Sequence, residues 1–563
     1  MPGTNLTRAE ADARSALLRV RSYRVELDLT GTGPTFGSTT VLRFACREPG
    51  AATFVDLVAA QVHEITLNGR PVDPAERYTD GRIHLTDLSA ENELRVVADG
   101  HYMNTGEGLH RSVDPVDQRT YLFTHFEVPD ARRVFATFEQ PDLKGRFTFI
   151  VTAPRDWTVF SNSPTPEPDP VSEFASVWRF AETPPISTYV TAVVAGPYHV
   201  VRDTYRAKSG QVVPLAVACR ASMASHLDAT EILTVTKQGF DHYLELFDRP
   251  YPFAKYDQIF VPEYNLGAME NVGCVTVREE FIFRSRVTEA RRSARANTLL
   301  HELAHMWFGD LVTMRWWDDL WLKESFATYV SVRCLAEATR WHAQAWTNFA
   351  TDRKAWGYRQ DQLPSTHPIV ADIQDLQDVQ VNFDGITYAK GAAVLRQLVA
   401  WVGTEAFFAG VRAYFDRHAW DSARLADLLA ALTEASGRDL ARWSRQWLTT
   451  AGPNTLRPEF TVTEAGRFAS FAVRQEAPAE HPTLRSHRIA IGLYRRDGGR
   501  LVRARRVELD LSGARTEVPE LVGEARPDLV LLNDDDLTYA LIRLDPHSMA
   551  TLARSIADIA ESL

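Results

Sequence analysis

Apolar and polar side chains alternate from about Tyr23 to Val200, as in the run Tyr23–Leu29. A two-residue period places one set of side chains on a core and the other in water, which is typical of half-buried β-strands. The pairs Asn68-Gly69 and Asp80-Gly81 interrupt the alternation, and both dipeptides favour tight hairpin turns. The first part of the chain is therefore predicted to form antiparallel β-sheets.

The apolar period becomes helical between about Ser225 and Trp447, apart from strand-like runs at Gln258–Val261 and Cys274–Val277. Alternation returns after Ala451 and predicts a small β-sandwich. An apolar stripe at helical spacing ends the chain and consists of Leu552, Ile556, Ile559 and Leu563. These patterns predict a multidomain α+β protein with an N-terminal β-sheet domain (1–200), a helical domain (201–450), a β-sandwich (451–543) and a short amphipathic C-terminal helix (544–563).

Composition and charge exclude several partners. The chain has 563 residues and a formal net charge of −11, whereas nucleic-acid binding needs concentrated Lys and Arg, so we expect no nucleic-acid partner. No apolar run reaches membrane-spanning length and Met1–Arg24 lacks a signal-peptide core, so we expect no membrane partner. The cysteines form no C-x-x-C pair and fit a reducing cytoplasm; they are Cys46, Cys219, Cys274 and Cys334.

The strongest chemical signal is the run His301-Glu302-Leu303-Ala304-His305 within a helical stretch. Residues four apart share a helix face, so both imidazoles can direct a nitrogen at one Zn²⁺ ion. A carboxylate beside such a metal can take a proton from water whose pKa the metal lowers. Glu302 is therefore the predicted general base.

A catalytic zinc requires a third protein ligand and one open position. Glu324 follows in the next helical stretch and is the predicted third ligand, which gives a thermolysin type of site with one Zn²⁺ per chain. The competing interpretation is a chance H-E-x-x-H on an amphipathic helix. Cys274 and Cys334 are rejected as ligands, because isolated cysteines are more often small buried apolar residues.

The pentapeptide Gly267-Ala268-Met269-Glu270-Asn271 lies about thirty residues before this motif, and eighteen residues separate His305 from Glu324. This combination and its order resemble the aminopeptidase N family, the membrane-alanyl-aminopeptidase-like gluzincin zinc metallopeptidases. Further matches lie at 138–142, 312–317 and 386–391, so the resemblance covers about Tyr23 to Asp545. It implies a thermolysin-like zinc catalytic domain at 201–450 and removal of single amino acids from peptides with a free N-terminus.

The resemblance also implies how a substrate would be held. Glu270 resembles the family's anchor for the α-ammonium group, and Glu127 resembles a second carboxylate from the first domain. Two carboxylates would reject peptides without a free amine, because their charges would then be buried unpaired. Gly267 and Ala268 would let the substrate backbone approach as an added edge strand, together with Met269 and Asn271 of the same segment. The alternative for Gly267 is a simple turn.

Tyr388 resembles the family's catalytic tyrosine, whose phenol hydrogen-bonds the developing oxyanion. Without this context it would be interpreted as a packed core tyrosine. His125 stands where relatives commonly have glutamine, which changes the expected surroundings of Glu127. Lys323 receives no role, and His367 is interpreted as a structural histidine.

Longer bacterial relatives continue into a large helical domain, whereas this sequence stops within what resembles the first helix of that domain. We therefore expect a truncated form with a more open active site, or a helix that docks on a partner chain. A leukotriene-hydrolase-like bifunctional enzyme is a second possible function, although that relative has glycine at the position of Ala268. An inactive peptide-binding relative is a third, although Glu302, Glu324 and Tyr388 are all present.

Overall fold

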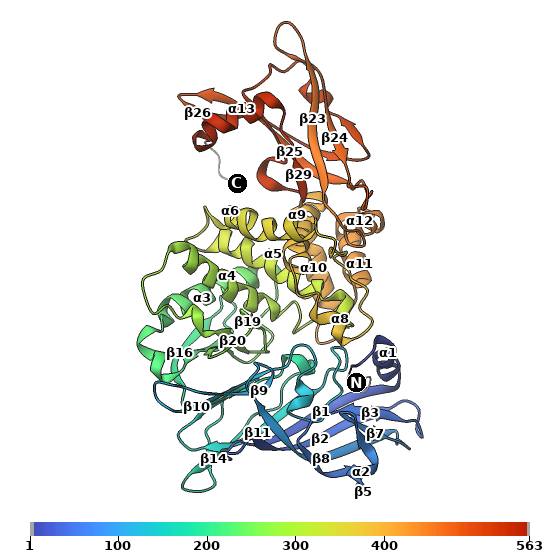
Figure 1. Ribbon diagram of the computed structural model, residues 1–563, viewed down its shortest axis with the longest axis vertical. Coiled ribbons are helices and arrows are strands. Elements are labelled where there is room, and N and C mark those ends of the chain that lie inside the picture. Colours follow the sequence, from blue (N-terminus) through green and yellow to red (C-terminus); the bar gives the residue numbers. More distant parts are fainter. Residues whose placement is uncertain (1–4, 560–563) are drawn as a thin grey trace. The chain divides into compact units, whose positions relative to one another are not determined.

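The computed structural model describes residues 5–559 of the chain. The chain folds into two compact units, whose helices and strands are labelled in Figure 1. Unit 1 comprises residues 1–319, 372–381 and 415–424, and unit 2 comprises residues 320–371, 382–414 and 425–563.

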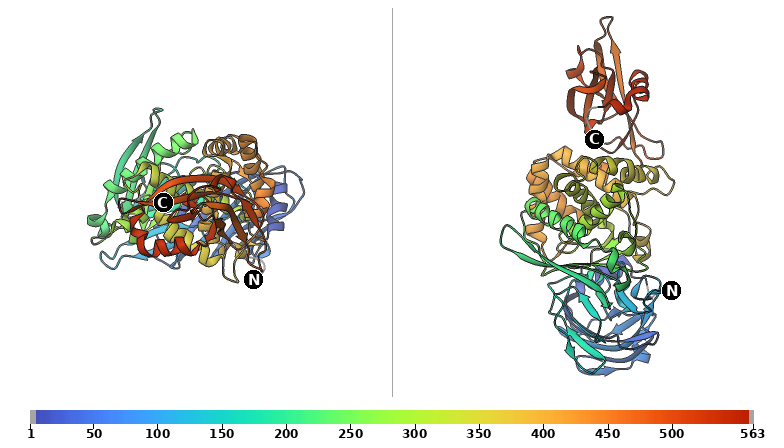
Figure 2. Two further views of the ribbon diagram at one scale, coloured as in Figure 1. Left: turned by 90° about the horizontal axis from the view of Figure 1, so that it is seen from above. Right: turned by 90° about the vertical axis from the view of Figure 1, so that its left-hand side faces the viewer.

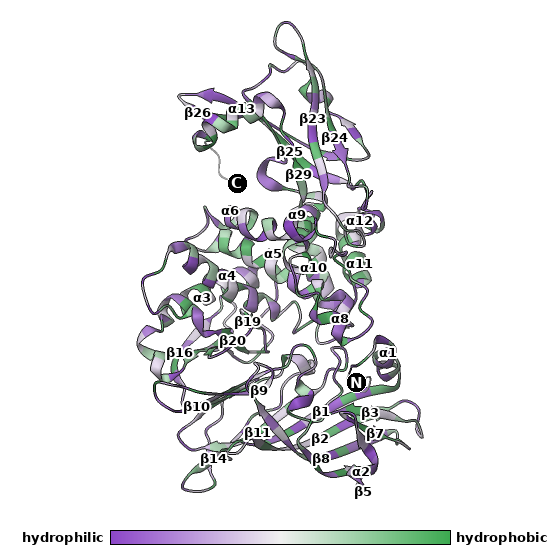
Figure 3. Cartoon of the chain, in the orientation of Figure 1, coloured by the Kyte–Doolittle hydropathy of each residue, from purple (hydrophilic) through white to green (hydrophobic). Residues whose placement is uncertain are grey.

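The largest sheet of unit 1 has twelve strands and arises from the alternating segment of the sequence. Buried and exposed residues alternate along β1 (Leu18–Asp28), β2 (Thr35–Cys46) and β8 (Glu91–Met103), and Figure 3 shows the same alternation in their hydropathy. The other strands are β4 (Gln61–Leu67), β5 (Arg70–Val72), β9 (Gly108–Val113), β10 (Thr120–His125), β11 (Arg146–Pro154), β12 (Thr158–Ser161), β13 (Asp169–Pro170), β14 (Ala175–Arg179) and β15 (Val193–Gly196). Figure 2 shows this sheet, in blue to cyan, from two further sides.

Most neighbouring strands of this sheet run antiparallel, as predicted, but two pairs run parallel. These pairs are β1 with β11 and β8 with β9. More than a hundred residues connect β1 to β11, so no hairpin turn sets the direction of that pair. The sheet is therefore mixed rather than antiparallel throughout.

Both predicted hairpin turns are present. Asn68, Gly69, Asp80 and Gly81 all have positive φ angles between 49° and 76°, as turns matched to the twist of the flanking strands require. The first pair joins β4 to β5 and the second joins β6 to β7. A small separate sheet is formed by β3 (Thr53–Asp56), β6 (Tyr78–Thr79) and β7 (Arg82–Leu85).

A five-stranded sheet of unit 1 has the order β16-β17-β18-β20-β19, so that β19 forms an edge. The two strand-like runs predicted inside the helical region correspond to β18 and β20, both almost wholly buried. The strands are β16 (His199–Arg206), β17 (Val212–Cys219), β18 (Tyr256–Val261), β19 (Ala268–Met269) and β20 (Cys274–Arg278). Helix α3 (Ala229–Phe247) packs on α4 (Glu289–His305), where the Tyr243 hydroxyl donates to the Leu300 carbonyl at 2.9 Å.

Short elements complete unit 1. They are α1 (Arg8–Leu17), α2 (Pro74–Arg77), α8 (Leu376–Gln380), β21 (Thr313–Met314) and β22 (Ser422–Ala423). The two strands β21 and β22 pair in parallel, and the Trp316 indole N–H donates to the Ile373 carbonyl at 2.9 Å. Segments 372–381 and 415–424 therefore belong to unit 1, together with the N-terminal part of the chain.

Unit 2 begins with helices around the buried helix α5. Of the residues of α5, fourteen from Trp321 to Leu335 are buried, and the helix packs against α9 and the π-helical segment η8. The helical elements are α5 (Trp321–Ala338), α6 (Ala345–Asn348), η7 (Phe349–Lys354), α7 (Ala355–Gln360), η8 (Ile386–Lys390), α9 (Gly391–Val402), α11 (Leu425–Ser436) and α12 (Ala441–Trp447). Helix α10 (Thr404–His418) begins in unit 2, and its last four residues belong to unit 1.

The predicted β-sandwich forms the second half of unit 2. One sheet has the order β27-β24-β23-β29 and the other β26-β25-β28, and apolar residues of both form one core. The strands are β23 (Asn454–Val462), β24 (Phe468–Glu476), β25 (His487–Asp497), β26 (Arg500–Leu511), β27 (Arg515–Glu517), β28 (Leu529–Leu532) and β29 (Ala540–Ile542).

Two buried cations fasten the sandwich to the helices of unit 2. Lys390 Nζ donates to Asp361 Oδ1 at 2.9 Å, and the same oxygen accepts the backbone N–H of Gly452 at 2.9 Å. Lys354 Nζ donates to the Thr538 carbonyl at 2.6 Å. Since Lys390 and Asp361 are both fully buried, removing either would leave an uncompensated charge away from water.

Helix α13 (Pro546–Ser555) is shorter than the predicted C-terminal helix. Leu552 and Ile559 pack against a small apolar cluster of the sandwich that contains Tyr494, Leu501 and Leu529. Ile556 is 69% exposed, and Leu563 lies outside the described residues. Part of the apolar stripe is thus covered by the chain's own sandwich.

The predicted fold class is confirmed, with an N-terminal β-sheet domain, a helical region, a β-sandwich and a short C-terminal helix. The exact residue ranges of the four predicted domains stay predictions. Between residues 5 and 559, none of the helices combines the length and apolar character needed to cross a bilayer.

The buried ring of His487 makes the stability of the sandwich depend on pH. Its Nε2–H donates to Gln475 Oε1 at 2.9 Å, and its Nδ1 accepts from the Thr538 hydroxyl at 2.9 Å. Burial, assisted by the charge of Arg485, lowers the pKa of His487 to about 3. Below the unfolded pKa of about 6.5 the unfolded chain therefore binds a proton that the folded chain does not, and stability falls as the pH falls.

We predict that His487→Gln removes this acid sensitivity. Between pH 7 and pH 5 the unsubstituted chain should lose about 2 kcal/mol more unfolding free energy than the variant, because about 1.5 pH units lie below the unfolded pKa. Denaturant unfolding at both pH values measures the difference. The control is His547→Gln, at an exposed position of α13, which should behave like the unsubstituted chain. Equal losses in His487→Gln and the unsubstituted chain would contradict the prediction.

Candidate metal centre

Helix α4 presents His301 and His305 on one face. The Thr288 hydroxyl caps its N-terminus by accepting the backbone N–H of Arg291. The two histidines follow one turn apart near the C-terminus, and their Nε2 atoms lie 3.0 Å apart. His305 is 1% exposed and His301 is half-buried. The two imidazoles therefore converge on one point.

The ring of His305 is oriented by a backbone carbonyl. Its Nδ1 lies 2.9 Å from the Phe308 oxygen, which can only accept a hydrogen bond, so Nδ1 carries the proton. In the neutral ring Nε2 then presents its lone pair toward His301. This carbonyl-oriented arrangement is the one that metal-binding histidines usually have.

The spacing of the two nitrogens fits zinc. Two ligands about 2.0–2.1 Å from a tetrahedral ion lie about 3.3 Å apart, which is within a few tenths of the observed 3.0 Å. Two neutral imidazole lone pairs facing each other repel unless a proton or a cation lies between them. Nitrogen donors in this geometry suit zinc well.

Two buried carboxylates lie next to His305 in unit 1. One ligand atom each from Glu270, Glu302 and His305 lies within 4.8 Å of the others. Glu270 is 2% exposed and Glu302 is 5% exposed, so water screens their mutual repulsion little. Such a pair favours a cation, either a metal ion or an ammonium group.

The pentapeptide lies along a sheet edge. Ala268 and Met269 form β19, which pairs with β20 on one side and ends the sheet on the other. The Gly267 carbonyl accepts the N–H of Arg278 at 3.0 Å, and a Cβ at Gly267 would have open space around it. This exposed glycine is not required by crowding, and it leaves the backbone accessible at the start of the edge strand.

Asn271 begins a buried hydrogen-bond chain. Its Nδ2 donates to Thr276 Oγ1 at 3.2 Å, and the Thr276 hydroxyl donates to the Tyr264 oxygen at 3.1 Å. A hydrogen bond of 3.2 Å joins the Tyr264 hydroxyl to His125 Nδ1. His125, which replaces the glutamine expected from relatives, thus has a defined partner beside Glu127.

Tyr264 is a candidate site residue that the sequence analysis did not identify. Burial, together with the negative charges of three carboxylates, raises its pKa well above the ordinary value. Its hydroxyl therefore stays protonated and available as a donor. The three carboxylates are Glu302, Glu127 and Glu270.

Glu127 follows strand β10 by two residues and is half-buried. The backbone N–H of Asp130 donates to the Phe126 carbonyl at 3.1 Å and closes a turn around Glu127. Phe126 is fully buried and packs edge-to-face on Phe135. The half-buried carboxylate is thereby carried on an anchored turn.

Glu324 and Tyr388 belong to unit 2. Glu324 lies in the first turn of α5, is 2% exposed and forms an ion pair with Lys323 Nζ at 2.7 Å. Lys323, to which the sequence assigned no role, is equally buried and lies 6.0 Å from the Phe383 ring centre. The ionised carboxylate is the form that binds a metal, and an opposite charge at this distance favours that form.

Tyr388 lies in the π-helical segment η8 and is half-buried. Asp384 Oδ1 accepts the backbone N–H groups of Ile386 at 2.9 Å and Thr387 at 3.1 Å, so it caps the start of η8. His367 Nε2 lies 2.9 Å from Asp384 Oδ2. His367 therefore supports the cap of the segment that carries Tyr388.

The four cysteines are buried, and none forms a disulfide bond. Among residues 5–559, the groups of side chains able to hold a metal contain no cysteine. Burial raises the pKa of the Cys274 thiol to about 12, which disfavours the thiolate that a metal requires.

Two family models match the chain. The Peptidase M1 N-terminal domain matches residues 21–190, and the Peptidase family M1 domain matches residues 231–447. The chain belongs to peptidase family M1. The second match contains α4 with both histidines, Glu302 and the pentapeptide, as well as Glu324 and Tyr388 of this M1 chain.

Named relatives agree with this membership. Aminopeptidase N of Streptomyces lividans is 61% identical over the whole M1 chain and 66% of its own length. Tricorn protease-interacting factor F2 of Thermoplasma acidophilum is 32% identical over 75% of the chain and 51% of its own length. Leucyl aminopeptidase of Saccharolobus solfataricus is 29% identical over 78% of the chain and 54% of its own length. The chain spans about half to two thirds of the length of these relatives.

The His367–Asp384 contact predicts a pH-dependent support for η8. Burial alone would lower the pKa of His367, but the hydrogen bond and charge of Asp384 outweigh burial and raise the pKa. The His367–Asp384 contact therefore adds its full contribution to the free energy of unfolding below the unfolded-state pKa of about 6.5. This contribution is lost as the pH rises through the raised pKa of the folded state. His367→Gln should therefore lower the melting temperature more at pH 6 than at pH 9. Asp384→Asn should show the same trend, and equal deficits at both pH values would argue against the contact.

Proposed function

We propose that this M1 chain is a zinc-dependent aminopeptidase that removes N-terminal amino acids from peptides. The observation that carries the proposal is the meeting of two converging imidazole nitrogens and two buried carboxylates in unit 1. The pentapeptide begins with Gly267, around which there is open space, and continues into the edge strand β19. Metal ligands, a proton acceptor and a backbone-binding edge are the parts that an exopeptidase site needs.

We propose His301, His305 and Glu324 as the zinc ligands. In support, Glu324 is buried in the first turn of α5, which begins two residues after the end of unit 1. The paired Lys323 favours the ionised form of Glu324.

Zinc bound there would polarise the scissile carbonyl and lower the pKa of water. Glu302 would accept a proton from the attacking water at a carboxylate oxygen and later pass it to the leaving amine. Its position supports this role, because the buried carboxylate lies within 4.8 Å of a His305 ring nitrogen. The phenol of Tyr388 would donate a hydrogen bond to the oxyanion.

Glu270 and Glu127 would bind the α-ammonium group of the substrate. Glu270 is almost completely buried, so its charge gains most from a cationic partner. One carboxylate oxygen of Glu127 lies within 4.8 Å of one of Glu270, which supports a shared ammonium site. The substrate backbone would extend along β19 from Gly267 through Ala268 and Met269, with Asn271 holding the end of the segment through Thr276.

We further propose that peptides with a free N-terminus are the substrates and that the protein works in the cytoplasm. The names of the relatives support the first proposal, since two of those described are aminopeptidases. The four buried cysteines support the second, because they form no disulfide bond that would need an oxidising compartment.

We predict that Glu302→Gln strongly lowers turnover but leaves the bound zinc in place. The turnover of leucine anilide should fall about 100- to 10,000-fold, which is the usual contribution of a general base. Elemental analysis should find the same zinc content as in the unsubstituted chain. If Glu302→Gln hydrolyses the anilide at the original rate, the assignment of the base is wrong.

Glu270→Gln should weaken selection for free amines. A charged hydrogen bond contributes about 1.5–3 kcal/mol, so kcat/KM for leucine anilide should fall about 10- to 100-fold. The rate on N-acetyl-leucine anilide should change little. The panel is run with the metal present, after chelation and after zinc is added back. Activity that survives chelation, or equal rates on free and acetylated anilides, would overturn the proposed function.

A further inference from the structure

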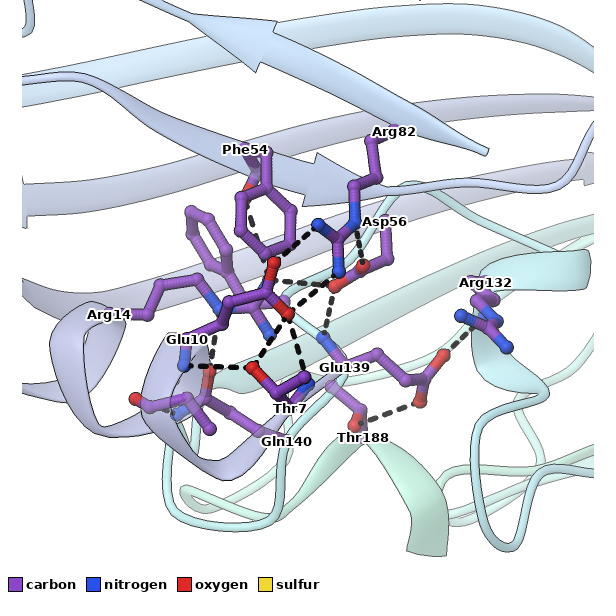
Figure 4. Close-up of polar contacts among 12 residues, drawn as sticks. Thr7, Glu10, Arg14, Phe54, Asp56, Arg82, Arg132, Glu139, Gln140 and Thr188 are labelled. Carbon is purple, nitrogen blue, oxygen red and sulfur yellow. Dashed lines mark hydrogen bonds and ion pairs between the residues drawn. The ribbon is translucent and has the colours of Figure 1, made fainter. Parts of the chain in front are cut away.

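The carboxylate of Glu139 lies at the meeting point of three segments of unit 1. It is 2% exposed, and its Oε2 accepts the backbone N–H of Arg132 at 2.6 Å (Figure 4). Its Oε1 lies 3.4 Å from Thr188 Oγ1. Its own backbone N–H donates to Asp56 Oδ2 at 3.1 Å. Nothing in the proposed chemistry uses this buried acid.

The hydrogen bond from Arg132 to Glu139 restrains the turn that carries Glu127. Arg132 is the middle residue of the 3-10 turn η2 (Ala131–Arg133) and follows Glu127 by five residues. The carbonyl of Arg132 accepts the N–H of Val58 at 2.7 Å, so its peptide groups are held on both sides. Glu139 thereby fixes the exit of the Glu127 turn.

The Thr188 contact leads to the segment that carries Glu270. Thr188 begins the 3-10 turn η3 (Thr188–Val190), and the Val190 carbonyl accepts the N–H of Val272 at 3.0 Å. Asn162 Nδ2 donates to the carbonyls of both Val190 and Val272 at 3.0 Å. Val272 follows Glu270 by two residues, so η3 fastens the end of this segment.

The backbone of Glu139 is anchored to a buried ion pair between Asp56 and Arg14. Asp56 is fully buried and accepts a bond from Arg14 Nη1 at 2.7 Å. Arg14 Nε also donates to Gln140 Oε1 at 2.6 Å, and its guanidinium lies 4.6 Å from the Phe54 ring centre (Figure 4). Gln140 fastens helix α1 through Ala11, whereas Glu139 faces the two turns. Glu139 and Gln140 are neighbours in the sequence but contact different segments, the two 3-10 turns and helix α1.

We infer that Glu139 is a positioning residue that holds the Glu127 turn and the Glu270 segment in register, so that both carboxylates can bind one ammonium group. This inference rests on the proposed function. Charged hydrogen bonds to an ammonium group need distances of about 2.7–2.9 Å, so small displacements of either carboxylate weaken binding. Glu139 itself touches no substrate atom in this role.

The chain offers a matched set of variants. Burial raises the pKa of Glu139 to about 8, so a neutral glutamine is a close replacement that still accepts from Arg132. Glu139→Leu keeps the volume but removes both contacts. Gln140→Leu removes the neighbouring contacts to α1 and leaves both turns alone, which makes it the control for a loss of stability.

The test combines hydrogen exchange with kinetics on the full chain. In Glu139→Leu we expect amide exchange at 127–133 and 270–273 to quicken at least tenfold. KM for leucine anilide should rise about tenfold, while kcat changes less than threefold and zinc content stays the same. Glu139→Gln should restore exchange and KM to within twofold. Gln140→Leu should lower the melting temperature and leave KM unchanged.

The outcomes separate the inference from the proposed function. Unchanged exchange in Glu139→Leu, or a KM that rises equally in Gln140→Leu, overturns the positioning role even if the chain is an active aminopeptidase. A chain that hydrolyses no aminoacyl-anilide overturns the proposed function. In that case the exchange rates still decide whether Glu139 holds the two segments.

Discussion

The hydrogen bond from His305 Nδ1 to the Phe308 carbonyl is the constraint on which the rest of the site depends. It turns the second ring nitrogen toward His301, one helical turn away, and leaves a lone pair where a cation is needed. Glu270 and Glu302 add negative charge at the same place, out of contact with water. Each feature is costly alone, and a shared positive charge relieves all of them together.

The surrounding scaffold keeps these groups in place without using long loops. Helix α4 supplies both histidines from a regular element, and the edge strand β19 supplies Ala268 and Met269 of the pentapeptide. Regular elements hold side chains more precisely than loops do. The loop after α4 is also secured, because Lys144 Nζ donates to the carbonyls of Asp310 and Leu311 at 3.1 Å. Burial lowers the pKa of Lys144 to about 7.

Local patterns predicted most of the fold and identified the main candidate site residues. Alternation marks strands such as β1 because its period is short. Fixed spacing marks His301 and His305 because both lie on α4, and the pentapeptide is one short run of sequence. Contacts between residues that are far apart in the sequence produce no local sequence pattern of this kind. The parallel pairing of β1 with β11 and the bond from Tyr264 to His125, 139 residues away, depend on the whole fold. The burial of Lys323 was equally hidden, since lysines are rarely buried.

The bond network of Asp361 has an evolutionary consequence. This carboxylate joins Lys390, two residues after Tyr388, to the backbone of Gly452 at the entrance of the sandwich. Recombination that exchanged the sandwich for a foreign module would remove one donor from a fully buried acid beside the tyrosine's own segment. The helical part and its sandwich should therefore be inherited as a pair, and shuffled hybrids should need compensating changes at residue 361 or 390.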